Sequence, residues 1–184
     1  MDLVEPPASG RPSGTTALVV AIPAILVLAV LPFLQIGDGT SLPQLSLFLG
    51  RFHPTLLHLP VALMLLALLL EAIRLPGLRR VAPAFPATVL DSVLWLAALS
   101  ALAAAMTGWV LSHEGGYDAQ LLGRHLWAGV ATAIGAFLCV VLRALTVPRL
   151  ATAVVAVTCG TMFVAAHAGG SLTHGEDYLT EHAP

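Results

Sequence analysis

Lysine is absent from this sequence, and charged residues of any kind are scarce. All 8 basic residues are arginines, charged residues make up only 10% of the chain, and hydrophobic residues make up 58%. Soluble domains carry roughly 25% charged residues, so this balance excludes an ordinary soluble domain and indicates a chain embedded in a bilayer. The small net charge of −2 and the lack of a basic tract give no reason to expect a nucleic-acid partner.

Cysteines and catalytic motifs are equally scarce. The 2 cysteines, Cys139 and Cys159, lie inside apolar runs, and we interpret them as small core residues. No Cys-x-x-Cys-His motif is present, so the chain does not by itself attach a c-type haem. There is also no nucleophile–base set and no phosphate-binding loop. We therefore expect an electron-transfer or anchor subunit rather than an enzyme.

Five apolar runs are long enough to cross about 30 Å of hydrocarbon. They cover residues 16–34, 54–73, 90–111, 126–142 and 150–168. We interpret the first as an uncleaved anchor rather than a signal peptide, because acids precede it and no small-residue cleavage site follows. The expected division is a cytoplasmic tail, anchor and outer linker over 1–46, a four-helix membrane domain over 47–180 and an outer tail over 181–184.

The arginines predict the orientation of the chain. Six of them, at positions 11, 74, 79, 80, 143 and 149, flank the spans on the side of the N-terminus. Only Arg51 and Arg124 lie on the other side. The positive-inside rule then places the N-terminus in the cytoplasm and the C-terminus in the periplasm, across a bacterial inner membrane. An outer aromatic belt is expected from Trp109, Tyr117, Trp127 and Tyr178.

The 7 histidines all fall at or near the predicted outer face. They are His53, His58, His113, His125, His167, His174 and His182. Imidazoles of membrane bundles face protein or cofactor rather than lipid, so this one-sided distribution is the main functional signal. The inner side offers few polar groups, namely Asp91 and an expected interfacial pair of Glu71 with Arg74.

The sequence also contains a short internal repeat. Gly-Arg-Phe-His at residues 50–53 and Gly-Arg-His at residues 123–125 each precede an inward span, an arginine-bearing loop and an outward span. We interpret residues 51–118 and 124–178 as two repeated helical hairpins, related by an axis along the membrane normal. The expected fold is an all-α integral membrane protein: a four-helix bundle of these hairpins plus one extra N-terminal helix. Pro54 and Pro60 predict a kink in the second span.

A b-type haem needs one or two axial imidazoles and an apolar slot. The cofactor-binding candidates, of which two would ligate the haem iron, are His53, His58, His125 and His167. As the pair that ligates the iron, the repeat favours His53 with His125, because the two positions are equivalent in the two hairpins. His58 with His167 is the other natural pair, because both are expected to lie deeper in the membrane. Secondary candidates are His113, His174 and Glu114. Two other interpretations stay open: outer acids could complete a bare metal site, and interfacial histidines often only cap helices or contact headgroups.

Three segments carry a resemblance to a known family. They are "RFHPTLLHLPVALMLLALLLE" at 51–71, "GGYDAQLLGRHLWAG" at 115–129 and "HAGGSLTHGEDYLT" at 167–180. Over residues 47–180 the chain resembles a bacterial family of four-helix predicted membrane domains of unknown function, and especially its branch found before planctomycete-type cytochrome c domains. The matching positions are His53, Pro54, His58, Pro60, His125, Gly169, Gly170 and His174.

The resemblance implies a redox setting but no established activity. This chain departs from that branch because it has an added N-terminal span and stops at Pro184, so the redox partner is expected to be a separate subunit. We expect a membrane subunit that binds haem b near the outer face and passes electrons from a membrane donor, such as quinol, to a periplasmic c-type cytochrome. No histidines serve the inner side, so electrons are not expected to cross the bilayer. The alternatives are a cofactor-free anchor or assembly subunit of a redox complex, and a transporter or metal-handling protein.

Overall fold

The computed structural model describes residues 14–34, 42–75, 77–78 and 85–177, and within them the chain is all helical. The elements are α1 Gly14–Val30, η1 Leu31–Phe33, α2 Gln44–Gly50, α3 His53–Leu56, α4 His58–Ile73, α5 Ala87–Leu111, η3 Ser112–Glu114, α6 Ala119–Ala144 and α7 Pro148–His174. Several expectations concern residues outside these ranges: Arg11, Arg79, Arg80, Tyr178, His182 and the tail over 181–184.

Within the described residues, five helical stretches are long and apolar enough to cross a membrane, which confirms the all-α, multi-span prediction. They are Gly14–Phe33, Gln44–Ile73, Ala87–Glu114, Ala119–Ala144 and Pro148–His174. Each helical stretch extends beyond its predicted apolar run at one end or at both, because hydropathy detects only the apolar part of a helix. Arg143, expected in a loop between two spans, consequently lies inside α6.

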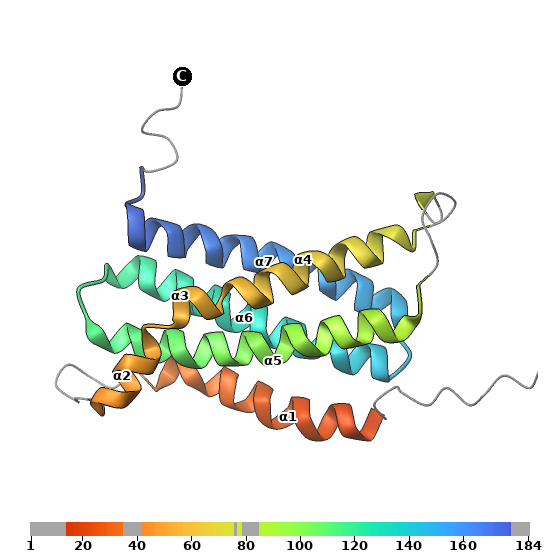
Figure 1. Cartoon of the computed structure of the whole chain (residues 1–184), viewed down its shortest axis with the longest axis horizontal. Helices are drawn as coiled ribbons and strands as arrows, with labels where there is room; N and C mark the ends of the chain where they lie inside the picture. Colours follow the sequence, from red (N-terminus) through yellow and green to blue (C-terminus); the bar gives the residue numbers. More distant parts are fainter. Residues whose placement is uncertain (1–13, 35–41, 76, 79–84, 178–184) are drawn as a thin grey trace, which may run out of the picture.

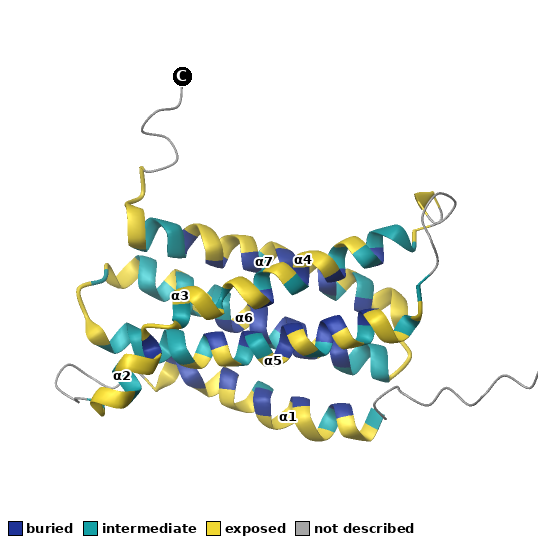
Figure 2. Cartoon of the chain, viewed as in Figure 1, coloured by how far each residue is buried: buried dark blue, intermediate teal, exposed yellow. Residues whose placement is uncertain are grey.

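The long helices lie side by side and alternate in direction (Figure 1). We call the end where α3 and α6 begin and α7 ends the histidine end, because the described histidines lie there. The opposite end, where α4 and α6 finish and α7 begins, is called the arginine end after Arg143. Figure 2 shows buried residues turned toward the neighbouring helices and exposed ones turned outward. The outward side chains are largely apolar, as a lipid-facing surface requires.

Small side chains dominate the core where the helices touch. On α5 these include Ala97, Ala98, Ala101 and Ala104, and on α6 they include Ala133 and Ala136. Small residues let helix backbones approach closely in lipid, where helix packing depends on such contacts. The first helix joins this common core through Ala17, Ala21, Ala24 and Leu28. It is therefore packed into the bundle rather than loosely attached.

The second membrane-spanning stretch consists of three helical pieces, and the break at Leu57 is the kink that the prolines predict. α2, α3 and α4 are separated at Arg51–Phe52 and at Leu57. Pro54 lies in the first turn of α3, where its missing N–H costs nothing. Pro60 has no N–H for the carbonyl of Leu56, so the helix ladder is interrupted beside Leu57. His53 is the first residue of α3, between the two breaks.

Candidate functional site

His53, the first residue of α3, places its ring against α5. Its Nδ1 lies 2.8 Å from the carbonyl oxygen of Ala104. A carbonyl oxygen only accepts hydrogen bonds, so Nδ1 carries the hydrogen and Nε2 holds the free electron pair of the neutral ring. The Nε2 atom is buried and has no hydrogen-bond partner within the described residues. Buried polar atoms are nearly always paired, so this nitrogen calls for an explanation.

His125, near the start of α6, repeats the arrangement in the second half of the chain. Its Nδ1 donates to the carbonyl oxygen of Ala165 on α7, again over 2.8 Å. The Nε2 atom is therefore also the unprotonated nitrogen of the neutral ring. The rings of His53 and His125 meet, with centroids 5.9 Å apart and planes inclined by 78°. Two imidazoles from facing helices thus converge, each tethered through Nδ1 to a backbone carbonyl.

Each ring also rests on a glycine one helical turn beyond the carbonyl that it binds. A Cβ atom on Gly108 would stand 2.7 Å from Cε1 of His53, and one on Gly169 would stand 2.9 Å from Cε1 of His125. Real Cβ atoms do not approach this closely. The two rings therefore occupy the spaces that side chains at these positions would take. The contact set of histidine, alanine carbonyl and glycine is the same in both halves.

The spacing of the two rings suits a shared metal. Imidazole nitrogens bind metals at about 2.0–2.1 Å, so two imidazoles on opposite sides of one ion have ring centres roughly 6 Å apart. A backbone carbonyl that accepts from Nδ1 fixes the tautomer in which Nε2 is the ligand. Among the described residues no group of three metal-binding side chains occurs. The pair thus suits a centre that takes two imidazoles and draws its other ligands elsewhere, as haem iron does.

The other two predicted ligands lie away from this pair's buried environment. The His58 ring is exposed, and its Nδ1 lies 2.6 Å from the carbonyl of Pro54 in the preceding turn. The His167 side chain is exposed on α7. The structure therefore brings together His53 and His125 and leaves His58 and His167 on the surface of the bundle.

The secondary candidates lie farther along the histidine end. His113 donates from Nδ1 to the carbonyl of Trp109, over 2.8 Å, and its ring contacts that indole edge to face with centroids 4.6 Å apart. Glu114 pairs with Arg51, with Oε1 and Nε 2.8 Å apart. His174 is the last residue of α7 and is exposed. The Nε1 atom of Trp109 is buried and, like Nε2 of His53, has no hydrogen-bond partner within the described residues.

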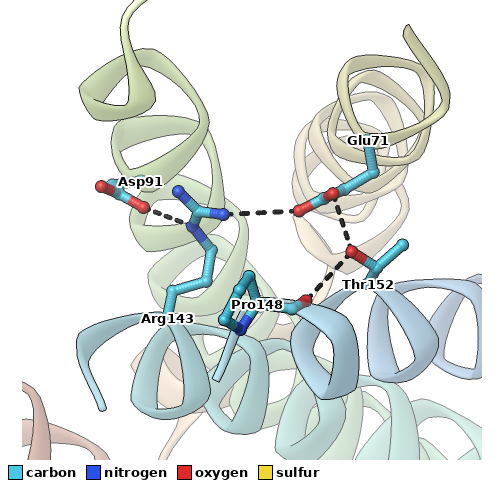
Figure 3. Close-up of polar contacts among 5 residues, drawn as sticks. All are labelled: Glu71, Asp91, Arg143, Pro148 and Thr152. Carbon is cyan, nitrogen blue, oxygen red and sulfur yellow. Dashed lines mark hydrogen bonds and ion pairs between the residues drawn. The ribbon is translucent and has the colours of Figure 1, made fainter. Parts of the chain in front are cut away.

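Sequence reasoning missed a buried charge network at the arginine end. Arg143 on α6 binds Asp91 on α5 through Nε, and its Nη1 lies 3.5 Å from Oε1 of Glu71 on α4. Thr152 on α7 donates to Oε2 of Glu71 over 2.8 Å, and also lies 3.1 Å from the carbonyl of Pro148. Figure 3 shows the guanidinium between the two carboxylates. The network ties four helices together.

The three charged side chains of this network are largely withdrawn from solvent. Their side-chain exposures are 8% for Arg143, 7% for Glu71 and 13% for Asp91. Instead of an interfacial pair with Arg74, Glu71 turns into the bundle, while the Arg74 guanidinium lies 4.9 Å from the centre of the Phe85 ring. The available signal was three ionisable residues at the same ends of apolar spans, which in a membrane normally face one another.

The predicted core cysteines are buried, in agreement with the sequence interpretation. Cys139 and Cys159 are both free thiols. Cys159 lies on α7 with its Sγ 3.5 Å from the carbonyl of Met64 on α4. Between the two ends of the bundle, Thr132 and Thr161 join α6 to α7 with hydroxyl oxygens 3.2 Å apart. These contacts hold helices together at mid-depth.

The chain matches no protein-family model, no curated protein and no solved structure.

Proposed function

We propose that this chain is a membrane electron-transfer subunit in which His53 and His125 are the axial ligands of a b-type haem. The observation that carries the proposal is the tethering of both rings through Nδ1 to backbone carbonyls, with their centroids 5.9 Å apart. The buried, unpartnered Nε2 of His53 supports it as well, because iron ligation would satisfy that atom.

The chain's own residues prepare two nitrogen ligands and protect them. The carbonyls of Ala104 and Ala165 hold a proton on each Nδ1, which keeps both Nε2 atoms free to bind a metal. Farther along the same helices, buried side chains such as Ala101 on α5 and Val130 on α6 keep the interior apolar. Haem, when bound, supplies reversible one-electron chemistry whose potential depends on axial ligands and on their hydrogen bonds.

The proposed site lies near one end of the spans, which supports exchange of electrons with a soluble partner on that side. With the orientation that the arginines predict, this side is periplasmic and the partner is a c-type cytochrome or another redox subunit, with quinol as a possible donor in the membrane. Within the described residues, the opposite end carries Arg143, Asp91 and Glu71 but no histidine. We therefore propose that electrons enter and leave near the histidine end.

The repeated contact set also supports the proposed internal duplication. In α5 and α7 the alanine whose carbonyl accepts the histidine's hydrogen bond lies four residues before the glycine, as Ala104 with Gly108 and Ala165 with Gly169. The proposed architecture is two related hairpins, α3–α4 with α5 and α6 with α7. The extra helix α1 covers the outside of this pair of hairpins. The axis that relates the hairpins would pass between the two imidazoles.

The second candidate function is a cofactor-free anchor or assembly subunit. One observation favours it: each histidine already ties two helices together through its hydrogen bond to a backbone carbonyl. Histidines that only tie helices would leave the protein colourless. The apolar outer surface of the helices would then serve solely to hold a redox complex in the bilayer.

The deciding experiment is a reduced-minus-oxidised absorption spectrum of the detergent-purified protein, with a pyridine haemochrome assay and total metal analysis. We expect a b-type spectrum with near-stoichiometric haem, abolished by His53→Ala or His125→Ala. His58→Ala and His167→Ala are the matched controls and should retain it. A colourless wild-type protein from haem-replete cells would favour the anchor, and haem retained in the His53→Ala/His125→Ala variant would refute the ligand assignment.

A further inference from the structure

The two glycines under the imidazoles have a more specific role than close packing of helices. Four other helical glycines, including Gly129 on α6 and Gly160 on α7, would meet nothing within 4 Å if they carried a Cβ atom. Gly108 and Gly169 instead face the rings of His53 and His125, with Cε1 and Nδ1 nearest and Nε2 farther, at 3.2 Å and 3.8 Å from the two Cβ positions. The absence of a side chain at these two positions is therefore matched to a ring in each case.

We call each glycine, together with the alanine carbonyl of the preceding turn, the seat of its histidine ring: Gly108 with Ala104 for His53, and Gly169 with Ala165 for His125. The geometry of each seat determines which ring nitrogen is free to bind a metal. With the ring laid on the glycine, Nδ1 reaches the alanine carbonyl of the preceding turn, and Nε2 is left unprotonated. A methyl group at Gly108 would occupy the space of Cε1 and push the His53 ring off the carbonyl. The ring would then lose both its orientation and its fixed tautomer.

We infer that Gly108 and Gly169 are positioning residues for a metal centre with two imidazole ligands, and that each seat presents the Nε2 atom of one histidine to the iron. This inference rests on the proposed function, since it concerns the same pair of histidines. The two seats act together: with either ring displaced, the pair no longer presents two nitrogens at the required separation. The seats also fix the inclination of the ring planes, which is 78°.

The first test compares alanine variants at the two glycines that contact a histidine ring with alanine variants at two glycines that contact nothing. Gly108→Ala and Gly169→Ala are titrated with hemin beside Gly129→Ala and Gly160→Ala, which give the same gain in helix propensity without touching a ring. Loss of groups that orient a metal ligand typically weakens metal binding by about 10–100-fold, and we expect that loss in the seated variants only. We also expect a shifted reduction potential in any haem that they retain. Equal hemin affinity in all four variants would overturn the inference.

The second test needs no haem. Diethyl pyrocarbonate modifies unprotonated imidazole nitrogens, and the buried Nε2 of His53 should react slowly in the wild-type protein. Gly108→Ala should expose this ring and accelerate its modification, as measured by peptide mass spectrometry, whereas Gly129→Ala should not. An unchanged rate at His53 in Gly108→Ala would refute the seat even if the protein binds haem.

A third variant guards against misfolding. If Gly108→Ala is unstable because its methyl group collides with the ring, removing the ring should relieve the collision. Gly108→Ala should then cost no stability in a His53→Ala background, and a persistent loss there would overturn the steric argument. A wild-type protein that binds no hemin would sink the proposed function, and with it the presentation of Nε2 to the iron. The modification rates and the stability comparison would still decide separately whether the glycines position the rings.

Discussion

Arg143→Met removes the guanidinium that binds two buried carboxylates at once. In this variant Asp91 loses its bond to Nε, and Glu71 keeps only the hydroxyl of Thr152 among its contacts in the network. Removing one partner of a buried ion pair typically costs about 3–5 kcal/mol. Asp91 is somewhat more exposed than Glu71, at 13% against 7%, which moderates the cost of losing its contact with Arg143. We therefore expect a loss of about 3 kcal/mol, the lower part of that range.

The assay is equilibrium unfolding in mixed detergent micelles, followed by far-UV circular dichroism. Arg124→Met is the matched control, because Arg124 lies on the same helix α6 with an exposed side chain and should tolerate the change. A triple variant, Glu71→Met/Asp91→Leu/Arg143→Met, replaces the network by apolar groups and should recover most of the loss, since buried ion pairs repay little beyond their own desolvation. If Arg143→Met is as stable as Arg124→Met, or the triple variant is as unstable as the single one, the reasoning fails.

Three smaller predictions use the same unfolding assay. Thr152→Val should cost about 1.5–3 kcal/mol, because it removes a hydrogen bond to a charged, buried carboxylate, and a neutral result would show that Glu71 finds another donor. Phe137→Ala should cost about 3–5 kcal/mol, because Phe137 is a fully buried ring on α6. Phe163→Ala, on the exposed side of α7, should cost far less, and equal effects of the two variants would contradict the burial pattern. Glu114→Gln should change stability by less than about 1 kcal/mol, because the side chain of its partner Arg51 is 69% exposed and solvent screens the pair. A larger loss would mean that the pair is shielded in the membrane.

Much of the architecture could be read from local sequence. Apolar runs predict helices that cross a membrane, because only hydrogen-bonded helices or closed barrels satisfy the backbone in lipid. Pro60 predicts the break beside Leu57 because its effect on the helix ladder is local. Helix ends were less predictable, and misplacing the end of α6 hid the buried network of Arg143. The helix continues past the apolar segment, so a residue expected in a loop lies within α6.

The candidate site was predictable in part. The repeat suggested that His53 and His125 face each other, and the structure places their rings in contact. The alternative pairing of His58 with His167 was equally natural on the sequence, yet both side chains are exposed. Whether any of these rings binds haem stays a prediction. The Gly108 seat also had no signal beyond a small residue on a helix, because its role depends on a ring 55 positions away in sequence (108 minus 53).

The sequence by itself determined that this protein is a set of apolar helices with imidazoles at one end and arginines mainly at the other. These properties follow from composition and from the order of residues along each helix. The tertiary structure alone decided which side chains meet: His53 with the carbonyl of Ala104, His125 with that of Ala165, and Arg143 with Asp91 and Glu71. The physical reason is that the rotation of a helix about its axis is set by packing against its neighbours, and a small rotation moves a side chain from the lipid surface to the interior.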